Sequence, residues 1–490
     1  MKVLLVNAPP LKTLGITGQI YPPLGILYLA SYAREKRNDL EIKAIDGYKE
    51  KRETLVERIL NYKPRVLGVS FTTQAATGAY HLINEVKERD NDIYVVAGGA
   101  HPTIVPEDVF KNTKIDMVVV SEGEETFLEI LEKIDGSEED MDSIVGTVVL
   151  QNGKIKSNLM RPYMEDLDEI PFPARDLLDI KKYPGYMYKR FDHDTDIISA
   201  RGCPFNCVYC SNPIWKQQKP WYRLRSPKNV VDEMEHIVEA YGIREFFDQT
   251  DEFNGSKKWA KDVCDEIINR KLDIAWKAQT RVDSIDEELA EKLVQSGFWM
   301  ALFGLESANA RALKGIKKKQ TLEQMDKALD IMKEKDIKCF GLFMAFNVWE
   351  EDGRLCFEDK EDSLRTLAYL KRLLKEKKLH LFGWSMTTPY PGSELYNLAV
   401  KYNLIDKEYV GKWEYFDSGS NFLMRLPGVE EKDWLEVLNA GKRLQAKRLL
   451  LSGNFNISAL PLYIRKALSL VKNYLYRRFR ILRKYKERHV

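Results

Sequence analysis

The chain of 490 residues is poor in cysteine, with only six. Cys264, Cys339 and Cys356 are far apart in the sequence, a spacing that does not suit the disulfide framework of a small secreted domain. We therefore expect a reducing, cytoplasmic compartment. The other three cysteines fall within one short stretch, SARGCPFNCVYCSN, and this concentration needs a separate explanation.

Long apolar runs are also missing. No stretch reaches the roughly 18 consecutive apolar residues of a membrane-spanning helix, and the apolar run in MKVLLVN is too short for a signal peptide. An excess of either charge is missing too, because 76 Lys and Arg residues nearly balance 74 Asp and Glu residues. The overall charge therefore gives no reason to expect a nucleic-acid partner.

The order of apolar and amphipathic segments indicates an α/β protein with several parts. Residues 1–145 alternate short apolar segments with amphipathic helices, which predicts a doubly wound parallel sheet. Residues 146–195 hold a hairpin-like GTVVLQNGKI and a proline-containing stretch, which we interpret as a connector. The alternation returns over 196–395 and predicts a partial (β/α)6 barrel. Residues 396–490 are predicted to form a mainly helical C-terminal region.

The clustered cysteines, Cys203, Cys207 and Cys210, have the spacing CxxxCxxC shortly after the apolar segment DIISA. Thiolates are soft ligands that favour zinc or iron–sulfur clusters. Structural zinc prefers four protein ligands, and no fourth cysteine or histidine is close in the sequence. The pattern therefore favours a [4Fe-4S] cluster with one iron left open. A structural zinc loop or buried core cysteines are the alternatives.

This cysteine loop resembles the signature of the radical S-adenosylmethionine (SAM) enzymes. In that family the amino and carboxylate groups of SAM bind the open iron. An electron from the cluster then cleaves SAM into methionine and a 5′-deoxyadenosyl radical. The resemblance implies that Tyr209 packs near the adenine of SAM and that an external electron donor reduces the cluster.

Two further segments are similar to stretches that contact SAM in this family. They are GLESA and AQTRVD, each at the end of a predicted strand. The resemblance implies SAM-binding roles for Gly304, Glu306, Ser307, Thr280 and Arg281. Any one of these residues taken singly could equally belong to an ordinary exposed strand end.

The N-terminal part resembles the cobalamin-binding domain that precedes the barrel in one branch of the radical SAM enzymes. The segments that carry this resemblance are YPPLGILYLASY, GGAHPT and SEGEETF. It implies a sheet that holds cobalamin with its nucleotide tail inserted between the strand-end loops. Glycine suits such loops because a Cβ would block the close approach of a large ligand. The expected contacts are Ser70, Thr72, Gly98, Gly99, His101 and Glu122.

The lower cobalt ligand is the point at which this sequence departs from many cobalamin proteins. They supply a histidine from D-x-H-x-x-G after the first strand, but residues 7–25 contain no histidine. We therefore expect base-off binding without a histidine from that loop. His101 is either a substitute ligand or a loop histidine satisfied by hydrogen bonds.

Together, these resemblances imply a cobalamin-dependent radical SAM enzyme. The expected reaction is the methylation of an unactivated carbon in a lipid or another hydrophobic small molecule. One alternative is a related enzyme that forms a ring or a carbon–carbon bond without methyl transfer. Another is a non-catalytic sensor that uses cobalamin or the cluster. No residue of the sequence stands out as catalytic.

The last segment, residues 461–490, is rich in Lys and Arg and contains one acidic residue, Glu487. Its apolar residues recur at spacings of three and four, which predicts a basic amphipathic helix. Such a helix can lie on an anionic membrane as a peripheral contact, or it can dock on the protein with a solvated basic face.

Overall fold

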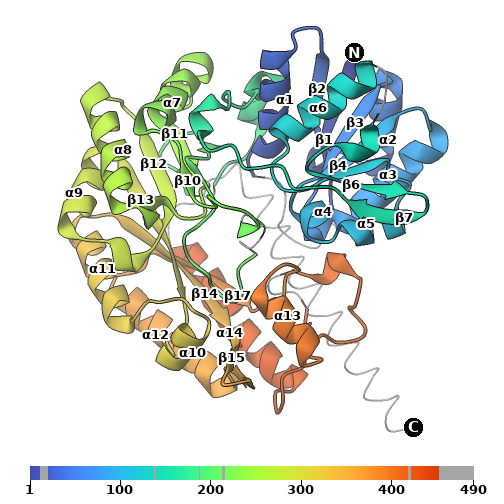
Figure 1. Ribbon diagram of the computed structural model, residues 1–490. Helices are drawn as coiled ribbons and strands as arrows, with labels where there is room; N and C mark the ends of the chain where they lie inside the picture. Colours follow the sequence, from blue (N-terminus) through green and yellow to red (C-terminus); the bar gives the residue numbers. More distant parts are fainter. Residues whose placement is uncertain are drawn as a thin grey trace, which may run out of the picture.

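A computed structural model describes residues 1–11, 20–136, 140–186, 188–211, 214, 216–417 and 421–451. The N-terminal sheet and the barrel form two lobes side by side, and the C-terminal region lies against both (Figure 1).

The N-terminal lobe is built on a sheet whose first five strands are parallel, in the order β2-β1-β3-β4-β5. Apolar clusters cover both faces of this sheet, which explains why its strands are almost wholly apolar. The strands are β1 (Lys2–Asn7), β2 (Glu41–Asp46), β3 (Val66–Ser70), β4 (Tyr94–Gly98) and β5 (Met117–Val119). The helices are α1 (Leu24–Lys36), α2 (Arg52–Tyr62), α3 (Ala76–Arg89), α4 (Ala100–Ile104), α5 (Pro106–Asn112) and α6 (Glu124–Asp135). The predicted doubly wound parallel sheet is confirmed.

An antiparallel hairpin extends this sheet beyond β5. It consists of β6 (Thr147–Gln151) and β7 (Lys154–Ser157), and β6 pairs with β5. Its turn residues Asn152 and Gly153 both have positive φ, as a tight two-residue hairpin turn requires. We had assigned this hairpin to the connector. The structure instead makes it the edge of the N-terminal sheet, because pairing with β5 is a tertiary contact that the local pattern does not reveal.

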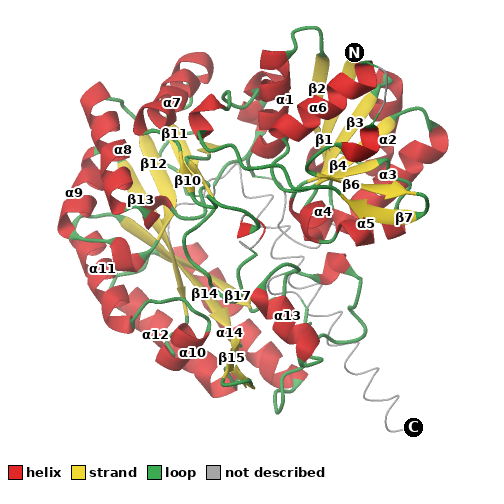
Figure 2. Ribbon diagram, viewed as in Figure 1, coloured by secondary structure: helices red, strands yellow, loops and turns green. Residues whose placement is uncertain are grey.

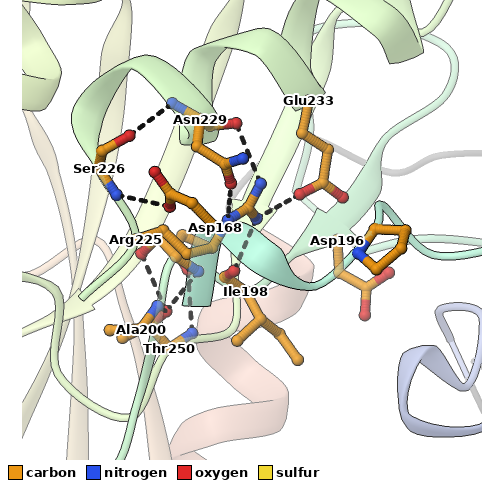
Figure 3. A network of polar contacts seen from close by, with 12 residues as sticks. Asp168, Asp196, Ile198, Ala200, Arg225, Ser226, Asn229, Glu233 and Thr250 are labelled. Atoms are coloured by element: carbon orange, nitrogen blue, oxygen red, sulfur yellow. Dashed lines mark hydrogen bonds and ion pairs between the residues drawn. The ribbon is translucent and has the colours of Figure 1, made fainter. Parts of the chain in front are cut away.

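Beyond the hairpin, a buried ion pair and a hydrogen bond fix the connector to the barrel. Arg175 is 2% exposed and donates from Nη1 to Glu233 Oε1 at 2.6 Å. The other oxygen of Glu233 accepts from Arg225, and Asp168 accepts from the backbone N–H of Ser226 at 2.9 Å (Figure 3). Because Arg175 and Asp168 both belong to the connector, the segment is held to the barrel at two points.

The barrel contains six parallel strands in the order β17-β14-β13-β12-β11-β8, with helices along its outer side (Figure 2). The strands are β8 (Thr195–Ile197), β11 (Glu245–Asp248), β12 (Ala275–Thr280), β13 (Phe298–Glu306), β14 (Lys338–Ala345) and β17 (Leu381–Met386). The helices are α7 (Pro227–Tyr241), α8 (Lys257–Arg270), α9 (Glu287–Gln295), α10 (Ala310–Gly315), α11 (Leu322–Glu334) and α12 (Lys360–Lys375). Short pairs β9 (Ala200–Arg201) with β10 (Arg223–Leu224), and β15 (Val348–Glu351) with β16 (Arg354–Phe357), lie outside the six-stranded sheet. The predicted partial (β/α)6 barrel is confirmed.

The inside of the barrel is closed at the amino ends of its strands. There Lys277 pairs with Asp194 at 2.7 Å and with Glu245 at 2.9 Å, and all three side chains are fully buried. Toward the carboxyl ends, burial alternates along β14, where Leu342 and Met344 are only half-buried. Since alternate residues of a strand face opposite sides, these two apolar side chains line the barrel interior.

The C-terminal region is mainly helical, with α13 (Glu394–Lys401) and α14 (Glu431–Leu451), and α14 packs against β17. Between these helices the chain returns to the N-terminal lobe. Trp413 donates from Nε1 to Asp108 at 2.7 Å, and Thr77 donates to Glu414 at 2.7 Å. The C-terminal region therefore contacts both lobes.

Within the described residues, no helix combines the length and the apolar character needed to cross a membrane. The basic amphipathic segment predicted over residues 461–490 lies outside the described residues. Its contact with a membrane stays a prediction.

Candidate functional site at the junction of the two sheets

A cavity of about 290 Å³ lies where the carboxyl ends of the N-terminal strands meet those of the barrel. This is the edge at which open parallel sheets bind their ligands. The N-terminal lobe contributes Ser70, Gly98, Gly99, Ser121 and Glu122, among others. The barrel contributes Ala200, Arg201, Gly202, Gln249, Thr250 and Asp251.

Four of the six predicted cobalamin contacts lie in this wall: Ser70, Gly98, Gly99 and Glu122. Gly99 has φ +97°, and a Cβ there would lie 2.9 Å from Ser70 Oγ and 3.1 Å from the carbonyl oxygen of Phe71. Both the backbone conformation and the space therefore require glycine. The result is a surface of small residues that a large ligand can approach closely.

The other two predicted contacts, Thr72 and His101, are not among the residues that line the cavity. Thr72 is exposed. His101 is 1% exposed, with Nε2 2.8 Å from the Tyr80 hydroxyl and Nδ1 3.3 Å from Thr73 Oγ1. Burial lowers the pKa of His101, although Asp108 opposes this. With both ring nitrogens engaged, His101 is arranged as a hydrogen-bonded core histidine and not as a cobalt ligand.

Ser121 was not among the expected cobalamin contacts. It has φ +67°, and its backbone N–H donates to Thr103 Oγ1 at 3.0 Å. Its own side-chain oxygen is buried without a hydrogen-bond partner in the described part of the chain, and the residue lines the cavity. Such an atom is satisfied when a polar ligand group is bound. Only its place in the segment SEGEETF could have pointed to it.

A buried ion network joins the two sides of the cavity. Glu122 pairs with Arg223 at 2.5 Å and with Arg201 at 3.2 Å, while Arg201 also pairs with Glu124 at 2.5 Å. Burial alone would raise the pKa of the Glu122 carboxyl, but the two guanidinium groups lower it below its ordinary value. Glu122 is thus an interdomain ion partner as well as a cavity residue, and neither arginine was singled out from the sequence.

The cysteine loop begins where the cavity wall ends, because Gly202 lines the cavity and Cys203 follows it. Cys203 is buried, Cys207 and Cys210 are half-buried, and none of the three forms a disulfide. Burial raises the pKa of the Cys203 thiol to about 12, so its thiolate needs a bound metal to stabilise it.

In the part of the chain that the structure describes, no three His, Cys, Asp or Glu side chains converge as ligands of one metal ion. A cubane cluster does not need such convergence, because each cysteine binds a different iron. Three thiols in one loop are the number of protein ligands that a [4Fe-4S] cluster with one open iron requires.

Beside this loop, Tyr209, Glu306 and Lys318 form a buried polar group. The hydroxyl of Tyr209 donates to Glu306 Oε1 at 2.9 Å, and Lys318 Nζ donates to the same oxygen at 3.1 Å. A Cβ at Gly304 would lie 2.5 Å from Glu306 Oε1 and 2.6 Å from Lys318 Nζ, so glycine makes room for the pair. Glu306 itself has φ +61°, a strained conformation typical of functional sites. Two predicted SAM residues, Tyr209 and Glu306, are thus in direct contact.

Of the predicted pair Thr280 and Arg281, Arg281 reaches the cysteine loop. The guanidinium of Arg281 lies 3.6 Å from the ring centroid of Phe205, and its Nη2 donates to the carbonyl oxygen of Lys318 at 2.8 Å. The hydroxyl of Thr280 is buried with no hydrogen-bond partner among the described residues. Arg281 therefore supports the loop, whereas Thr280 holds a polar atom that is still unsatisfied.

Ser307, the remaining predicted SAM residue, is fully buried and its hydroxyl is engaged within the protein. It donates to Glu358 at 2.5 Å and accepts from the backbone N–H of Asn309 at 2.9 Å. In this structure Ser307 stabilises the turn after β13.

Two further buried oxygen atoms near Cys203 have no partner within the described residues: Glu252 Oε1 and the Tyr222 hydroxyl. Both groups interact electrostatically with Cys203, and burial raises the pKa of Glu252 to about 8. Unsatisfied acceptors beside the cysteine loop fit the amino group of a bound SAM. The carboxylate of Asp248 differs from these unsatisfied atoms, because it accepts a hydrogen bond from Ser199. Asp251 lines the cavity.

Comparisons with known proteins agree with this site. The model of the B12 binding domain matches residues 13–131, and that of the Radical SAM superfamily matches residues 197–355. An uncharacterised methyltransferase of Pyrococcus horikoshii is 33% identical over 83% of this chain and 84% of that protein. The anaerobic magnesium-protoporphyrin IX monomethyl ester cyclase of Rubrivivax gelatinosus is 29% identical over 79% of this chain and 68% of that protein. The hopanoid C-3 methylase of Methylococcus capsulatus is 23% identical over 84% of this chain and 74% of that protein.

Solved structures show the same fold. OxsB with aqua-cobalamin and S-adenosylmethionine bound superposes with a TM-score of 0.70 at 18% identity, covering 97% of this chain and 72% of that chain. TsrM from Kitasatospora setae, with cobalamin and a [4Fe-4S] cluster bound, gives a TM-score of 0.65 at 19% identity. The match covers 80% of this chain and 76% of that chain.

The two domains and the cysteine loop define a radical SAM enzyme with a cobalamin-binding domain. More closely, the chain belongs to the cobalamin-dependent radical SAM methyltransferase family, and its cofactors are cobalamin, a [4Fe-4S] cluster and SAM.

Proposed function

We propose that the protein methylates an unactivated carbon of a hydrophobic small molecule. The observation that carries this proposal is the cavity whose wall combines the small-residue loops of the cobalamin-binding domain with the barrel residues next to Cys203. A substrate enclosed there lies between the two cofactor sites. When bound, the cluster and SAM supply the radical that removes hydrogen, and cobalamin supplies the methyl group.

The chain itself contributes positioning and the exclusion of water. Tyr209, Glu306 and Lys318 offer a preformed set of donors and acceptors to the polar groups of SAM. Ser121 and the glycine loops receive cobalamin by shape and by one buried hydroxyl. The ion network of Glu122 keeps the two walls together, so the distance between them is set before substrate enters.

Two features support a hydrophobic substrate. Leu342 and Met344 give the barrel interior an apolar lining, and Leu342 has glycine on both neighbouring strands, Gly304 and Gly383. The space beside these glycines is filled by Glu306 and Lys318 at Gly304 and by Leu342 itself at Gly383, so it is the apolar lining that supports a hydrophobic substrate. One relative is the hopanoid C-3 methylase, whose name joins this family to a lipid substrate.

We further propose two partners. The cluster needs an external electron donor, since SAM cleavage consumes an electron that the chain does not supply. Residues 461–490, with their excess of Lys and Arg, are proposed to hold the enzyme on an anionic membrane where a lipid substrate resides.

Ring formation without methyl transfer is the second candidate, because the relative in Rubrivivax gelatinosus is named a cyclase. The two candidates differ in product mass. Methylation adds a methyl group, whereas cyclisation removes hydrogen.

The test is anaerobic reconstitution with iron, sulfide and cobalamin, followed by incubation with lipid extracts and SAM that carries a deuterated methyl group. We expect 5′-deoxyadenosine together with a lipid that has gained the labelled methyl. A product that has lost hydrogen and gained no label would support the cyclase. Reconstituted protein that binds SAM without cleaving it would overturn both enzymatic proposals.

A further inference from the structure

Three exposed lysines lie beside the cysteine loop: Lys314, Lys317 and Lys319. We call them the lysine face. Lys314 lies in α10, and the other two lie in the loop that follows it. The carbonyl oxygen of Lys317 is 4.0 Å from Cys207 Sγ. One backbone segment therefore separates the cluster cysteine from the surface that carries these lysines.

A backbone hydrogen bond fixes this proximity. The N–H of Val208 donates to the carbonyl oxygen of Ile316 at 3.0 Å, one residue from each of the atoms just described. The loop that carries the lysines and the loop that carries the cysteines are thus bonded as a pair. Their distance does not depend on the positions of flexible side chains.

The backbone of the lysine loop places one lysine side chain in the protein interior and two on the surface. Lys317 and Lys319 have φ of +58° and +56° and are exposed. Lys318 between them is 7% exposed and donates to Glu306. One lysine charge therefore serves the buried polar group, and its two neighbours face solvent.

The lysine face keeps an excess of positive charge. Lys317 is paired with Glu394 at 2.5 Å. Lys314 and Lys319 have no carboxylate partner in the described portion of the chain. Partly exposed charges contribute little to folding stability, so these two lysines are available to an acidic partner.

We propose that the lysine face is the docking surface of an acidic one-electron carrier, a flavin or iron–sulfur protein. This inference rests on the proposed function, which requires reduction of the cluster. One electron leaves the reduced carrier and enters the cluster, so the carrier is oxidised and the cluster reduced by one electron, with no bond made or broken. Electron transfer slows steeply with distance, and the lysine face is in contact with a cluster cysteine. Complementary charge accelerates the short-lived encounters typical of such carriers.

The test reverses the two unpaired charges in the full-length chain, as the double variant Lys314→Glu and Lys319→Glu. The matched control is Lys327→Glu with Lys371→Glu, on the outer faces of α11 and α12. These lysines are also exposed, and they also lack a carboxylate partner within the described residues. Both variants change the net charge equally, so they separate a local effect from a global one.

Each variant is measured with two reductants: an acidic flavodoxin kept reduced by its NADPH-dependent reductase, and dithionite. At low ionic strength, we expect cluster bleaching by flavodoxin to slow about tenfold or more in the lysine-face variant and to stay unchanged in the control. Bleaching by dithionite stays unchanged in both. Binding of oxidised flavodoxin weakens in the lysine-face variant only, and its dependence on salt becomes flatter.

Equal rates and equal flavodoxin binding in the two variants would overturn the proposal. So would an equal loss with dithionite, because the substitution would then act on the cluster loop and not on the encounter. Failure of the proposed function looks different. It would leave the flavodoxin results intact while no methylated product forms.

Discussion

The two walls of the cavity use different residues for their cofactors. On the N-terminal side the wall consists of glycines and serines at strand ends, with Gly99 in a backbone conformation that excludes a side chain. On the barrel side the cysteine loop is surrounded by buried charged groups, among them Glu306 and Lys318. One wall is suited to recognition by shape, the other to metal ligation and charge. Mutations should therefore have separable effects on the two sides.

The largest effect should come from the barrel side, with Cys207→Ala. Loss of one of three thiolate ligands should abolish the brown charge-transfer absorbance and the formation of 5′-deoxyadenosine. Iron content, absorbance and deoxyadenosine yield after anaerobic reconstitution check this. Cys356→Ala serves as the control, because this cysteine lies in β16 away from the loop and its loss should leave all three unchanged. Retained turnover in Cys207→Ala would remove the basis for the cluster assignment.

The next effect tests the N-terminal side, with Gly99→Val. The new side chain would meet Ser70 Oγ and the Phe71 carbonyl, so we expect cobalamin binding to be lost while deoxyadenosine is still formed. Gly153→Val is the matched control, since Gly153 also has positive φ but nothing within 4 Å of its Cβ position. Gly153→Val carries a backbone penalty of about 1–2 kcal/mol, and Gly99→Val, at φ +97° and ψ −169°, carries one of about 1–3 kcal/mol. Only Gly99→Val should release cobalamin. Equal retention of cobalamin by the two variants would argue against recognition of cobalamin by shape.

A smaller effect is expected from Lys318→Met. This substitution leaves the buried carboxylate of Glu306 without its cation. Breaking a buried ion pair in this way lowers folding stability by about 3–5 kcal/mol. We expect SAM affinity to fall by roughly tenfold to a hundredfold, while cobalamin binding is unchanged. Titration with SAM and the cobalamin spectrum measure the two sides separately. Lys318→Arg, which keeps the charge, should restore part of the affinity.

The smallest effect concerns His101. We expect His101→Asn to leave the spectrum of bound cobalamin unchanged, because both ring nitrogens are engaged by protein groups. A changed spectrum would mean that the histidine ligates cobalt after all.

Folding stability provides a second measurement at His101. Burial lowers its pKa, so the folded state holds it neutral while the unfolded chain takes up a proton below about pH 6.5. Its contribution to stability is therefore complete above that pH and decreases as the pH falls below it. Urea unfolding at several pH values should show a shallower decrease in His101→Asn than in the unmodified protein.

The sequence predicted the elements of the fold closely where local patterns decide. One element of the predicted barrel repeat, α11 (Leu322–Glu334), begins at a Thr321 capping box, which is a local signal. The β6–β7 hairpin was recognised, but its sheet was not, since pairing with β5 depends on distant residues. Local sequence therefore predicts whether a segment is a helix or a strand better than it predicts which other elements that segment packs against.

The site shows the same limit. The cysteine spacing is a local signal, and two separate motifs pointed to Tyr209 and Glu306, which the structure brings into contact. Ser307 and Thr72 came from similar motifs, yet the Ser307 hydroxyl is engaged by Glu358 and Thr72 does not line the cavity, because side-chain direction is set by packing. Arg223 could not be predicted, since its role arises only when the lobes meet.

The return of the chain through Trp413 and Glu414 to the first lobe has a consequence for cofactor exchange. The connector, this return segment and the ion network of Glu122 join the lobes at separate places, so the lobes cannot move apart about a single hinge. Release of a corrinoid would require at least one of these interlobe contacts to break. We therefore expect bound corrinoid to outlast many rounds of catalysis.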